Sequence, residues 1–193
     1  MPALSEPAVA RAAAMSPAIV QRPSFATFYD EHYDFVWRNV RRLVSLDSVV
    51  DDLVQEVFII VLRRLPDFEW RSSSKTWTFG IVLNVVRDHR RMVRRRIMRQ
   101  SADFDQMIDP KGGLHGSMEK ALEVRVLHEL LAELDDDKRT VFVLAELEQM
   151  TAPEIVEVTG SSLTTVYGRL RDARREFEAA VQRHQERTRE GDR

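Results

Sequence analysis

The chain has 193 residues, of which 44% are hydrophobic and 31% are charged, with a formal net charge of −2. This length and composition suit one globular domain or two small ones, and they exclude a chain too polar to bury a core. The absence of cysteine excludes disulfide frameworks, thiolate zinc sites and cysteine nucleophiles. No apolar run approaches the roughly 18 residues of a membrane helix, and no signal pattern begins the chain. We expect no membrane insertion and a cytoplasmic location.

The first half of the chain predicts a tail followed by amphipathic helices. Residues 1–22 are rich in Ala, Pro and Ser without a strong apolar period, which predicts a disordered tail. A wide apolar face over 25–43 predicts the first helix. The second is predicted over 51–65, because its apolar residues, Leu62 among them, recur every three or four positions as one buried stripe. Pro66 ends it, since proline cannot continue the backbone hydrogen-bond ladder.

Polar, mostly acidic residues gather at the start of the second helix: Asp51, Asp52, Gln55 and Glu56. Acids near a helix N-terminus complement the helix dipole, and Ser48 followed by Asp51 resembles a capping box. The buried stripe does not require these residues. Two interpretations therefore remain open, a structural role at the helix start and an exposed surface that binds a partner.

A polar loop over 67–74 contains two aromatic residues and precedes a third helix predicted over about 75–96, which begins apolar and ends in arginines. Aromatic rings beside cations and amides suit splayed bases, because rings stack on bases, amides read base edges and cations bind phosphates. The candidate residues are Phe68, Trp70, Arg71, Lys75, Asn84, Arg87, Arg90, Arg91 and Arg94. A basic interaction tail or a solvated helix end explains the arginine run equally well.

Helical periodicity disappears over 100–118, where Asp, Pro and Gly cluster, and this segment predicts a flexible linker. No strand-like alternation occurs on either side of it. The fold class is therefore predicted as all-α, with two small helical domains over 23–99 and 119–187 and a C-terminal tail over 188–193.

The second domain carries the pattern of a helix-turn-helix. Leucines from Leu122 onward mark one helix, and apolar residues over 141–147 mark the next. Residues 151–154 have a capping-box pattern with proline in the first turn, and Gly160 ends the short helix that they begin. Another helix, longer and basic, starts near Ser162, which completes the helix-turn-helix layout.

The helix from Ser162 is predicted to bury Leu163, Val166 and Leu170, which leaves polar and basic side chains outward. Hydroxyls near a helix start suit phosphate positioning, and a guanidinium such as that of Arg169 can read guanine O6 and N7 together. The candidate residues for duplex DNA are Ser161, Ser162, Thr164, Thr165, Tyr167, Gly168, Arg169, Arg171 and Arg174. The alternative is a solvated helix face at the edge of a bundle.

No set of residues predicts catalysis. The five histidines lie in different segments without a helix-spaced ligand set, and no phosphate-binding glycine loop precedes a helix. We expect a protein that is not an enzyme, with no cofactor, no metal and no small-molecule substrate.

Three blocks together resemble the extracytoplasmic-function (ECF) group of bacterial sigma factors in the sigma-70 family. The first is DDLVQEVF at 51–58, and the third runs over 134–177 and begins LDDDKRTVFVLAELEQMTAPEI. The second is the spaced set Phe68, Arg71, Thr76, Trp77, Ile81, Asn84 and Asp88. The resemblance implies sigma region 2 over 23–99, for core-polymerase binding and minus-ten opening, and sigma region 4 over 119–187, for minus-thirty-five recognition.

The same resemblance implies the partners of the chain. The helix with Asp51, Asp52, Gln55 and Glu56 would dock on the clamp helices of the polymerase β′ subunit, and region 4 would lie at the β flap. Promoter DNA would meet the loop, the third helix and the helix-turn-helix. An anti-sigma factor would hold the protein inactive.

Several residues depart from the family pattern. Gly80 and Leu83 stand where many relatives carry basic residues, Tyr167-Gly168 replaces a frequent Lys-Ser pair, and Asp172 stands where a basic residue is usual. Promoter sequence therefore cannot be borrowed from relatives. Two other functions stay open, a helix-turn-helix regulator that binds an operator without polymerase and a sigma-like adaptor that binds another regulator.

Overall fold

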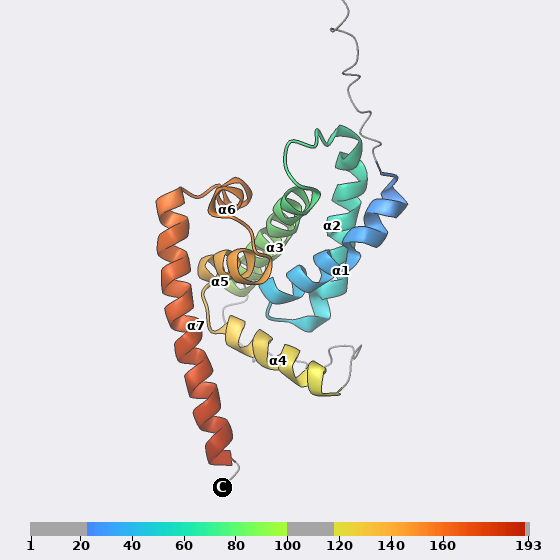
Figure 1. Cartoon of the computed structure of the whole chain (residues 1–193). Coiled ribbons are helices and arrows are strands. Elements are labelled where there is room, and N and C mark those ends of the chain that lie inside the picture. The colour runs from blue at the N-terminus through green and yellow to red at the C-terminus, as the bar shows by residue number, and fades with distance from the viewer. Residues whose placement is uncertain (1–22, 100–117, 192–193) are drawn as a thin grey trace, which may run out of the picture.

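The computed structural model describes residues 23–99 and 118–191, which form helices and no strand (Figure 1). The predicted tail over 1–22 and all but the last residue of the predicted linker lie outside the described residues. The first unit contains α1 (Phe25–Leu43), the 3-10 turn η1 (Asp47–Val49), α2 (Val50–Arg64), the 3-10 turn η2 (Leu65–Asp67) and α3 (Ser74–Arg99). The second contains α4 (Met118–Ala132), α5 (Asp136–Phe142), the π-helical turn η3 (Val143–Leu147), α6 (Ala152–Thr159) and α7 (Leu163–Gly191).

The first unit is a bundle in which α1, α2 and α3 all pack against one another. Ser24 caps α1, because its hydroxyl accepts a hydrogen bond from the Thr27 backbone N–H at 3.1 Å. The amphipathic periods of the three helices meet in a dry core. Its fully buried side chains are Phe28, Val36, Val40, Leu43, Val57, Val61, Phe79, Val82 and Val86.

Two predictions about α2 are wrong. The Ser48 capping box does not form, because η1 leads directly into α2 and the Val49 cap residue makes no side-chain hydrogen bond. Leu62 is 52% exposed rather than buried. A helix turns by about 100° per residue, so with Val61 fully buried the next side chain points well away from the core.

The helix-turn-helix of the second unit forms as predicted. The Glu154 carboxylate accepts hydrogen bonds from the Thr151 backbone N–H at 2.8 Å and from its hydroxyl at 2.7 Å. Gly160 ends α6 with φ 69°, a left-handed conformation in which glycine has no steric penalty. The helix α7 then runs through residue 191, so it includes residues 188–191 of the predicted tail.

Two leucines are exposed in the second unit, and of these Leu163 was predicted to be buried. Leu163 is 47% exposed at the start of α7, and Leu122 is 60% exposed in α4. Val166 and Leu170 are buried, at 0% and 9% exposed, and α7 packs against both α5 and α6. The buried stripe of α7 therefore begins one turn later than its sequence suggests.

The two units pack against each other in the described structure, with α3 against α6 and α1 against α5. Glu148 is the polar centre of this contact. Its carboxylate accepts hydrogen bonds from Arg42 at 2.6 Å and Arg38 at 3.4 Å, and its side chain is only 7% exposed. A second ion pair joins Arg90 of α3 to Asp136 of α5 at 3.1 Å.

A histidine from α4 sits in the same region. Burial, reinforced by Arg41, lowers the pKa of His128 from 6.5 to about 4, and nearby Asp47 opposes the effect only in part. The neutral ring is therefore the form that this site accommodates.

We expect the stability of the protein to fall in acid because of His128. The unfolded chain takes up this proton near pH 6.5, whereas the folded chain does so only near pH 4, so stability is lost as pH falls through that interval. The expected slope is at most about 1.4 kcal/mol per pH unit. Urea unfolding of the wild type and His128→Gln from pH 7 to pH 4 measures it; equal slopes in the two proteins would contradict the assignment.

Candidate protein and nucleic-acid interfaces

The start of α2 leaves three polar side chains unengaged. Asp52, Gln55 and Glu56 are exposed and make no hydrogen bond or ion pair within the described part of the chain. Asp51 differs, because its carboxylate accepts a hydrogen bond from the Trp37 indole of α1 at 3.2 Å. Asp51 therefore ties α2 to α1, and the other three side chains are available to a partner.

Two large apolar side chains extend this surface toward the end of α2. Ile59 and Leu62 are 49% and 52% exposed, and residues three or four positions apart lie on one side of a helix. Sequence reasoning missed both, because it assigned Leu62 to the core and gave Ile59 no role. We call the set the α2 face: Asp52, Gln55, Glu56, Ile59 and Leu62. Acidic groups beside exposed apolar ones suit a partner that offers basic and apolar side chains.

The loop between η2 and α3 is built around three aromatic rings. Phe68 is 6% exposed, with its ring centroid 4.7 Å from that of Trp70 and 4.5 Å from that of Trp77. Trp70 has φ 57°, and its indole N–H has no hydrogen-bond partner within the described residues. A bulky residue in this left-handed region is strained, and such strain clusters at functional sites.

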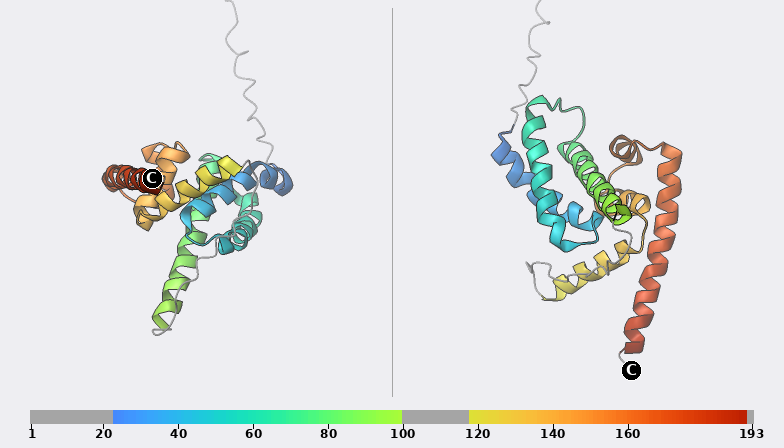
Figure 2. Two further views of the ribbon diagram at one scale, coloured as in Figure 1. Left: turned by 90° about the horizontal axis from the view of Figure 1, so that it is seen from below. Right: turned by 180° about the vertical axis from the view of Figure 1, so that it is seen from behind.

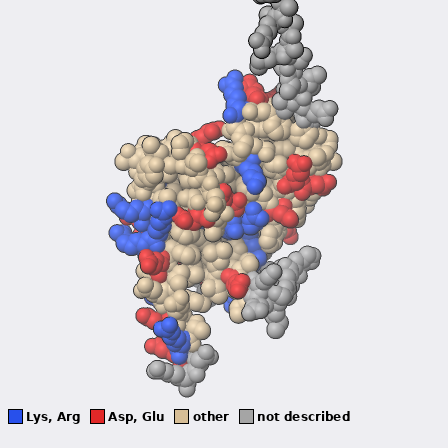
Figure 3. Space-filling view, in the orientation of Figure 1, with Lys and Arg blue, Asp and Glu red and all other residues tan. Residues whose placement is uncertain are grey.

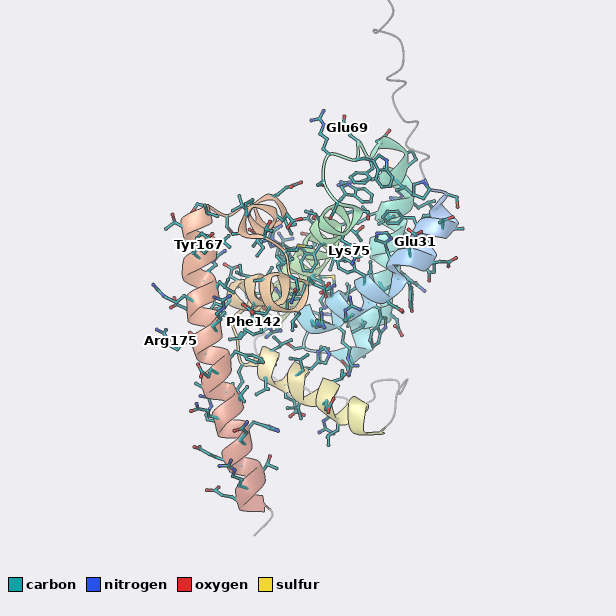
Figure 4. The ribbon with its side chains drawn as sticks, viewed as in Figure 1. Glu31, Glu69, Lys75, Phe142, Tyr167 and Arg175 are labelled. Atoms are coloured by element: carbon teal, nitrogen blue, oxygen red, sulfur yellow. The ribbon has the colours of Figure 1, made fainter. Side chains whose placement is uncertain are left out.

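An open hollow of about 340 Å³ lies beside the rings of Phe68 and Trp77, and Trp70 is not part of its lining. Arg71 at its rim is 84% exposed and pairs at 2.7 Å with Glu69, which points away from the bundle (Figure 4). Flat apolar walls with charged donors and acceptors around them can hold an unpaired base. The hollow is lined by Arg64, Asp67, Phe68, Glu69, Arg71, Ser72 and Trp77.

Along α3 the arginines divide into packed and accessible ones. Arg90 is 18% exposed and engaged by Asp136, and burial lowers the pKa of its guanidinium. Arg91 is 71% exposed, and residues 94–96 are exposed on the last turns, which project beyond the bundle (Figure 2). Of the remaining predicted contact residues, Lys75 and Asn84 are exposed and Arg87 is half-buried.

The first turns of α7 combine packed and outward residues. The Ser162 hydroxyl accepts a hydrogen bond from the Thr165 backbone N–H at 3.2 Å, which caps the helix. Arg169 donates to the Ser161 hydroxyl at 3.0 Å and pairs with Asp137, so its guanidinium packs on its own domain. The exposed side chains at this end of the helix include Leu163, Thr164, Thr165 and Tyr167.

Basic side chains gather over α7 on one side of the molecule (Figure 3). Arg171, Arg174 and Arg175 have side chains 78%, 60% and 73% exposed. Each pairs with a nearby acid, Asp172 or Glu146. Phosphate oxygens can displace such exposed partners, because exposed ion pairs are worth little in water. Gly168 lies about one turn before Arg171 on α7, with open space where a side chain would stand.

Two negative findings apply to residues 23–99 and 118–191. No group of three His, Asp or Glu side chains there could hold a metal ion. No helix there is long and apolar enough to cross a membrane.

Comparisons with known proteins agree with this architecture. The family described as Sigma-70 region 2 matches residues 28–96, and the one described as Sigma-70, region 4 matches residues 125–177. The chain is 34% identical over 140 residues to the ECF RNA polymerase sigma factor SigC of Mycobacterium tuberculosis, covering 72% of this chain and 73% of that protein. It is 30% identical over 142 residues to the sigma factor CnrH of Cupriavidus metallidurans, covering 70% and 74%.

Solved structures show the same fold. CnrH in complex with the cytosolic domain of CnrY matches with a TM-score of 0.59 and 26% identity, covering 82% of this chain and 87% of that one. The sigma factor RpoE of Bartonella quintana, solved with the anti-sigma factor NepR, matches with a TM-score of 0.67 and 21% identity, covering 81% and 97%. The chain belongs to the sigma-70 family, as an RNA polymerase sigma factor of the ECF type.

Proposed function

We propose that the chain binds core RNA polymerase through the α2 face and directs it to promoters. The observation that carries the proposal is the α2 face itself, because it leaves Asp52, Gln55 and Glu56 unengaged beside exposed Ile59 and Leu62. An isolated operator-binding regulator has no use for such a surface. The clamp helices of the β′ subunit are the proposed partner, and the polymerase supplies all the chemistry.

The hollow lined by Phe68 and Trp77 is the proposed receptor for a base of the minus-ten element, and Trp70 contacts it through Phe68. Its rings stack on the base, and the arginines at the end of α3 bind the phosphates of the opened strand. Arg90 is engaged by Asp136 in this conformation, so Arg91 and Arg94 are the better placed of the predicted contacts.

The helix α7 is the proposed reader of the minus-thirty-five element. Thr164 and Tyr167 face outward near its start, and Leu163 joins them as an apolar contact for a thymine methyl group. Arg171 and Arg174 are placed to bind phosphates and fix the helix in the groove. Arg169 must first leave Asp137 before it can read a guanine.

Two solved relatives were determined in complex with partners, one named as an anti-sigma factor and the other as the cytosolic domain of CnrY. An anti-sigma factor is accordingly the proposed inhibitor of this chain. The proposed location is the bacterial cytoplasm, where core polymerase and promoters meet, with region 4 at the β flap.

Reconstitution tests the proposal. Promoters selected by the protein with core polymerase from a random duplex library should support transcription only when both are present. The free protein should bind these duplexes far more weakly than the complex does. Tight, sequence-specific binding by the free protein without transcription would instead establish an operator-binding regulator, and no transcription together with no DNA binding would leave the adaptor.

Replacing Trp70 by alanine is expected to slow promoter opening, because we expect its ring, which contacts Phe68 at the hollow, to stack on a base of the opened strand. Stacking contributes about 1–3 kcal/mol per base, or about 5- to 150-fold. Opening is followed by the fluorescence of 2-aminopurine in the selected minus-ten element. Trp70→Phe, which retains a ring, is the matched control and should keep most of the rate. Binding to core polymerase should be unchanged in both variants, and equal opening by Trp70→Ala and wild type would exclude the stacking role.

A further inference from the structure

His32 is buried on α1 in a stretch of sequence that is otherwise polar. Its side chain is 6% exposed, whereas its neighbours Asp30, Glu31 and Asp34 are exposed. Glu31 points away from the bundle (Figure 4). A buried imidazole needs partners for both ring nitrogens, and the structure supplies two.

The two hydrogen bonds fix the tautomer of His32. Nδ1 lies 3.0 Å from the Phe28 carbonyl oxygen, and Nε2 lies 2.9 Å from the Ser74 hydroxyl. A carbonyl only accepts, so Nδ1 carries the proton and donates it. Nε2 of the neutral ring is then an acceptor, and the Ser74 hydroxyl donates to it. His32 thereby ties α1 to the first residue of α3.

A continuous series of ring contacts leads from His32 to the strained loop. His32 stacks on Phe28 with centroids 4.0 Å apart, and Phe28 meets the edge of Trp77 at 6.0 Å. Trp77 stacks on Phe68, which contacts Trp70. The loop is therefore held from α1 twice, through the rings at one end and through Ser74 at the other.

The surroundings of His32 favour its neutral form. Burial lowers its pKa, the Phe28 carbonyl and Glu31 oppose that change, and Lys75 at the start of α3 adds to it. A proton on Nε2 would force the Ser74 hydroxyl to turn and accept, and would place a positive charge near Lys75. Acid therefore strains the same connection that holds the loop.

We propose that His32 is a positioning residue for promoter opening, whose neutral ring holds Ser74 and the Trp70 loop in the conformation that receives a base. This role rests on the proposed function of the hollow. It assigns different tasks to adjacent serines: Ser73 caps α3 through the Thr76 backbone N–H at 3.0 Å, while Ser74 is the anchor.

Matched substitutions separate the anchor from simple packing. In His32→Gln the side-chain amide reaches the position of Nε2 and keeps the bond to Ser74, whereas His32→Asn reaches only the position of Nδ1 and loses it. Ser74→Ala removes the same bond while leaving the ring in place. Circular dichroism melting identifies any variant that fails to fold.

The free protein gives the first readout, limited trypsin digestion at Arg71 in the loop. We expect about tenfold faster cleavage there in His32→Asn and Ser74→Ala than in the wild type and His32→Gln, which corresponds to about 1.4 kcal/mol for one buried hydrogen bond. Cleavage at the exposed Arg187 of α7 is the internal control. An unchanged cleavage rate at Arg71 in Ser74→Ala would refute the role of the His32–Ser74 hydrogen bond in holding the loop, and this test does not involve polymerase.

The second readout is opening of the selected promoter with core polymerase. His32→Asn and Ser74→Ala should open it about tenfold more slowly and show no further loss when combined. The ratio of the wild-type opening rate to that of His32→Gln should decrease as the pH is lowered below 6.5. A pH-independent ratio, or a normal rate in Ser74→Ala, would refute the positioning role. If the wild-type protein does not bind core polymerase, the proposed function is refuted instead. The trypsin digestion still tests whether the His32–Ser74 hydrogen bond holds the loop.

Discussion

A protein in which Gln55 is alanine and Glu56 is lysine is expected to lose its complex with core RNA polymerase while keeping its helices. Neither side chain has a partner within the described structure, so the fold does not depend on them. The lysine would face the basic groups that an acidic surface attracts, and like charges at an interface cost several kcal/mol. We expect binding at least about 100-fold weaker, measured by co-elution in size exclusion and by anisotropy titration.

The chain offers a matched control for this experiment. Gln185 and Glu186 are the same pair of residue types, adjacent and exposed, on the last turns of α7. Gln185→Ala with Glu186→Lys changes the net charge equally and should bind core polymerase like the wild type. Equal weakening by both pairs would indicate a general charge effect, and no weakening by the α2 pair would return the acids to a purely structural role.

Replacing Glu148 by alanine is expected to lower the free energy of unfolding by about 3–5 kcal/mol. The mutation leaves Arg42 without its closest acid. The Arg42 side chain is only 13% exposed, so water cannot readily replace the lost carboxylate. Burial already lowers the pKa of Arg42, and Glu148 is the main group that counteracts this. The unpaired guanidinium must then be hydrated, either by water that enters the contact or by separation of the two units.

Urea unfolding and small-angle scattering measure the two consequences of Glu148→Ala, lost stability and a larger radius of gyration. Asp88→Ala removes an ion pair whose side chains are 70% and 71% exposed, and it should cost no more than about 1 kcal/mol. Replacing Arg42 and Glu148 together by methionine should recover most of the stability, since no buried charge is left. A loss from Glu148→Ala as small as that from Asp88→Ala would show that the contact is dispensable.

The helices and the helix-turn-helix were predictable because local patterns determine them. Apolar periods place the cores of α1 to α3, and the Thr151–Glu154 capping box and Gly160 bound α6 through contacts within a few residues. Leu62 and Leu163 were assigned to the core incorrectly, because periodicity marks a stripe and not its edges. Hydropathy alone does not distinguish a leucine at the edge of the stripe that packs in the core from one that stays exposed to solvent.

The state of the predicted site residues depended on contacts far apart in sequence. The pairing of Arg90 with Asp136, and of Arg169 with Asp137, joins residues tens of positions apart, and no spacing rule reports such distances. The left-handed backbone of Trp70 could not be predicted from the sequence either, because that conformation is expected only at residues such as glycine or asparagine. His32 lies among acidic residues, a pattern typical of a solvent-exposed helix face, and only the packing of α1 on α3 reveals its burial.

The contact between the two units limits how far apart their proposed DNA-binding surfaces can lie. Promoter elements centred 25 base pairs apart are separated by about 85 Å along B-form DNA. With α3 held on α6 and α1 on α5, the surfaces proposed for the two elements belong to one packed body. Eighteen intervening residues, 100–117, span about 60 Å at full extension, so a separated chain approaches the required distance. We therefore expect every ion pair that joins the units, Glu148 with Arg42 above all, to oppose simultaneous contact with both promoter elements.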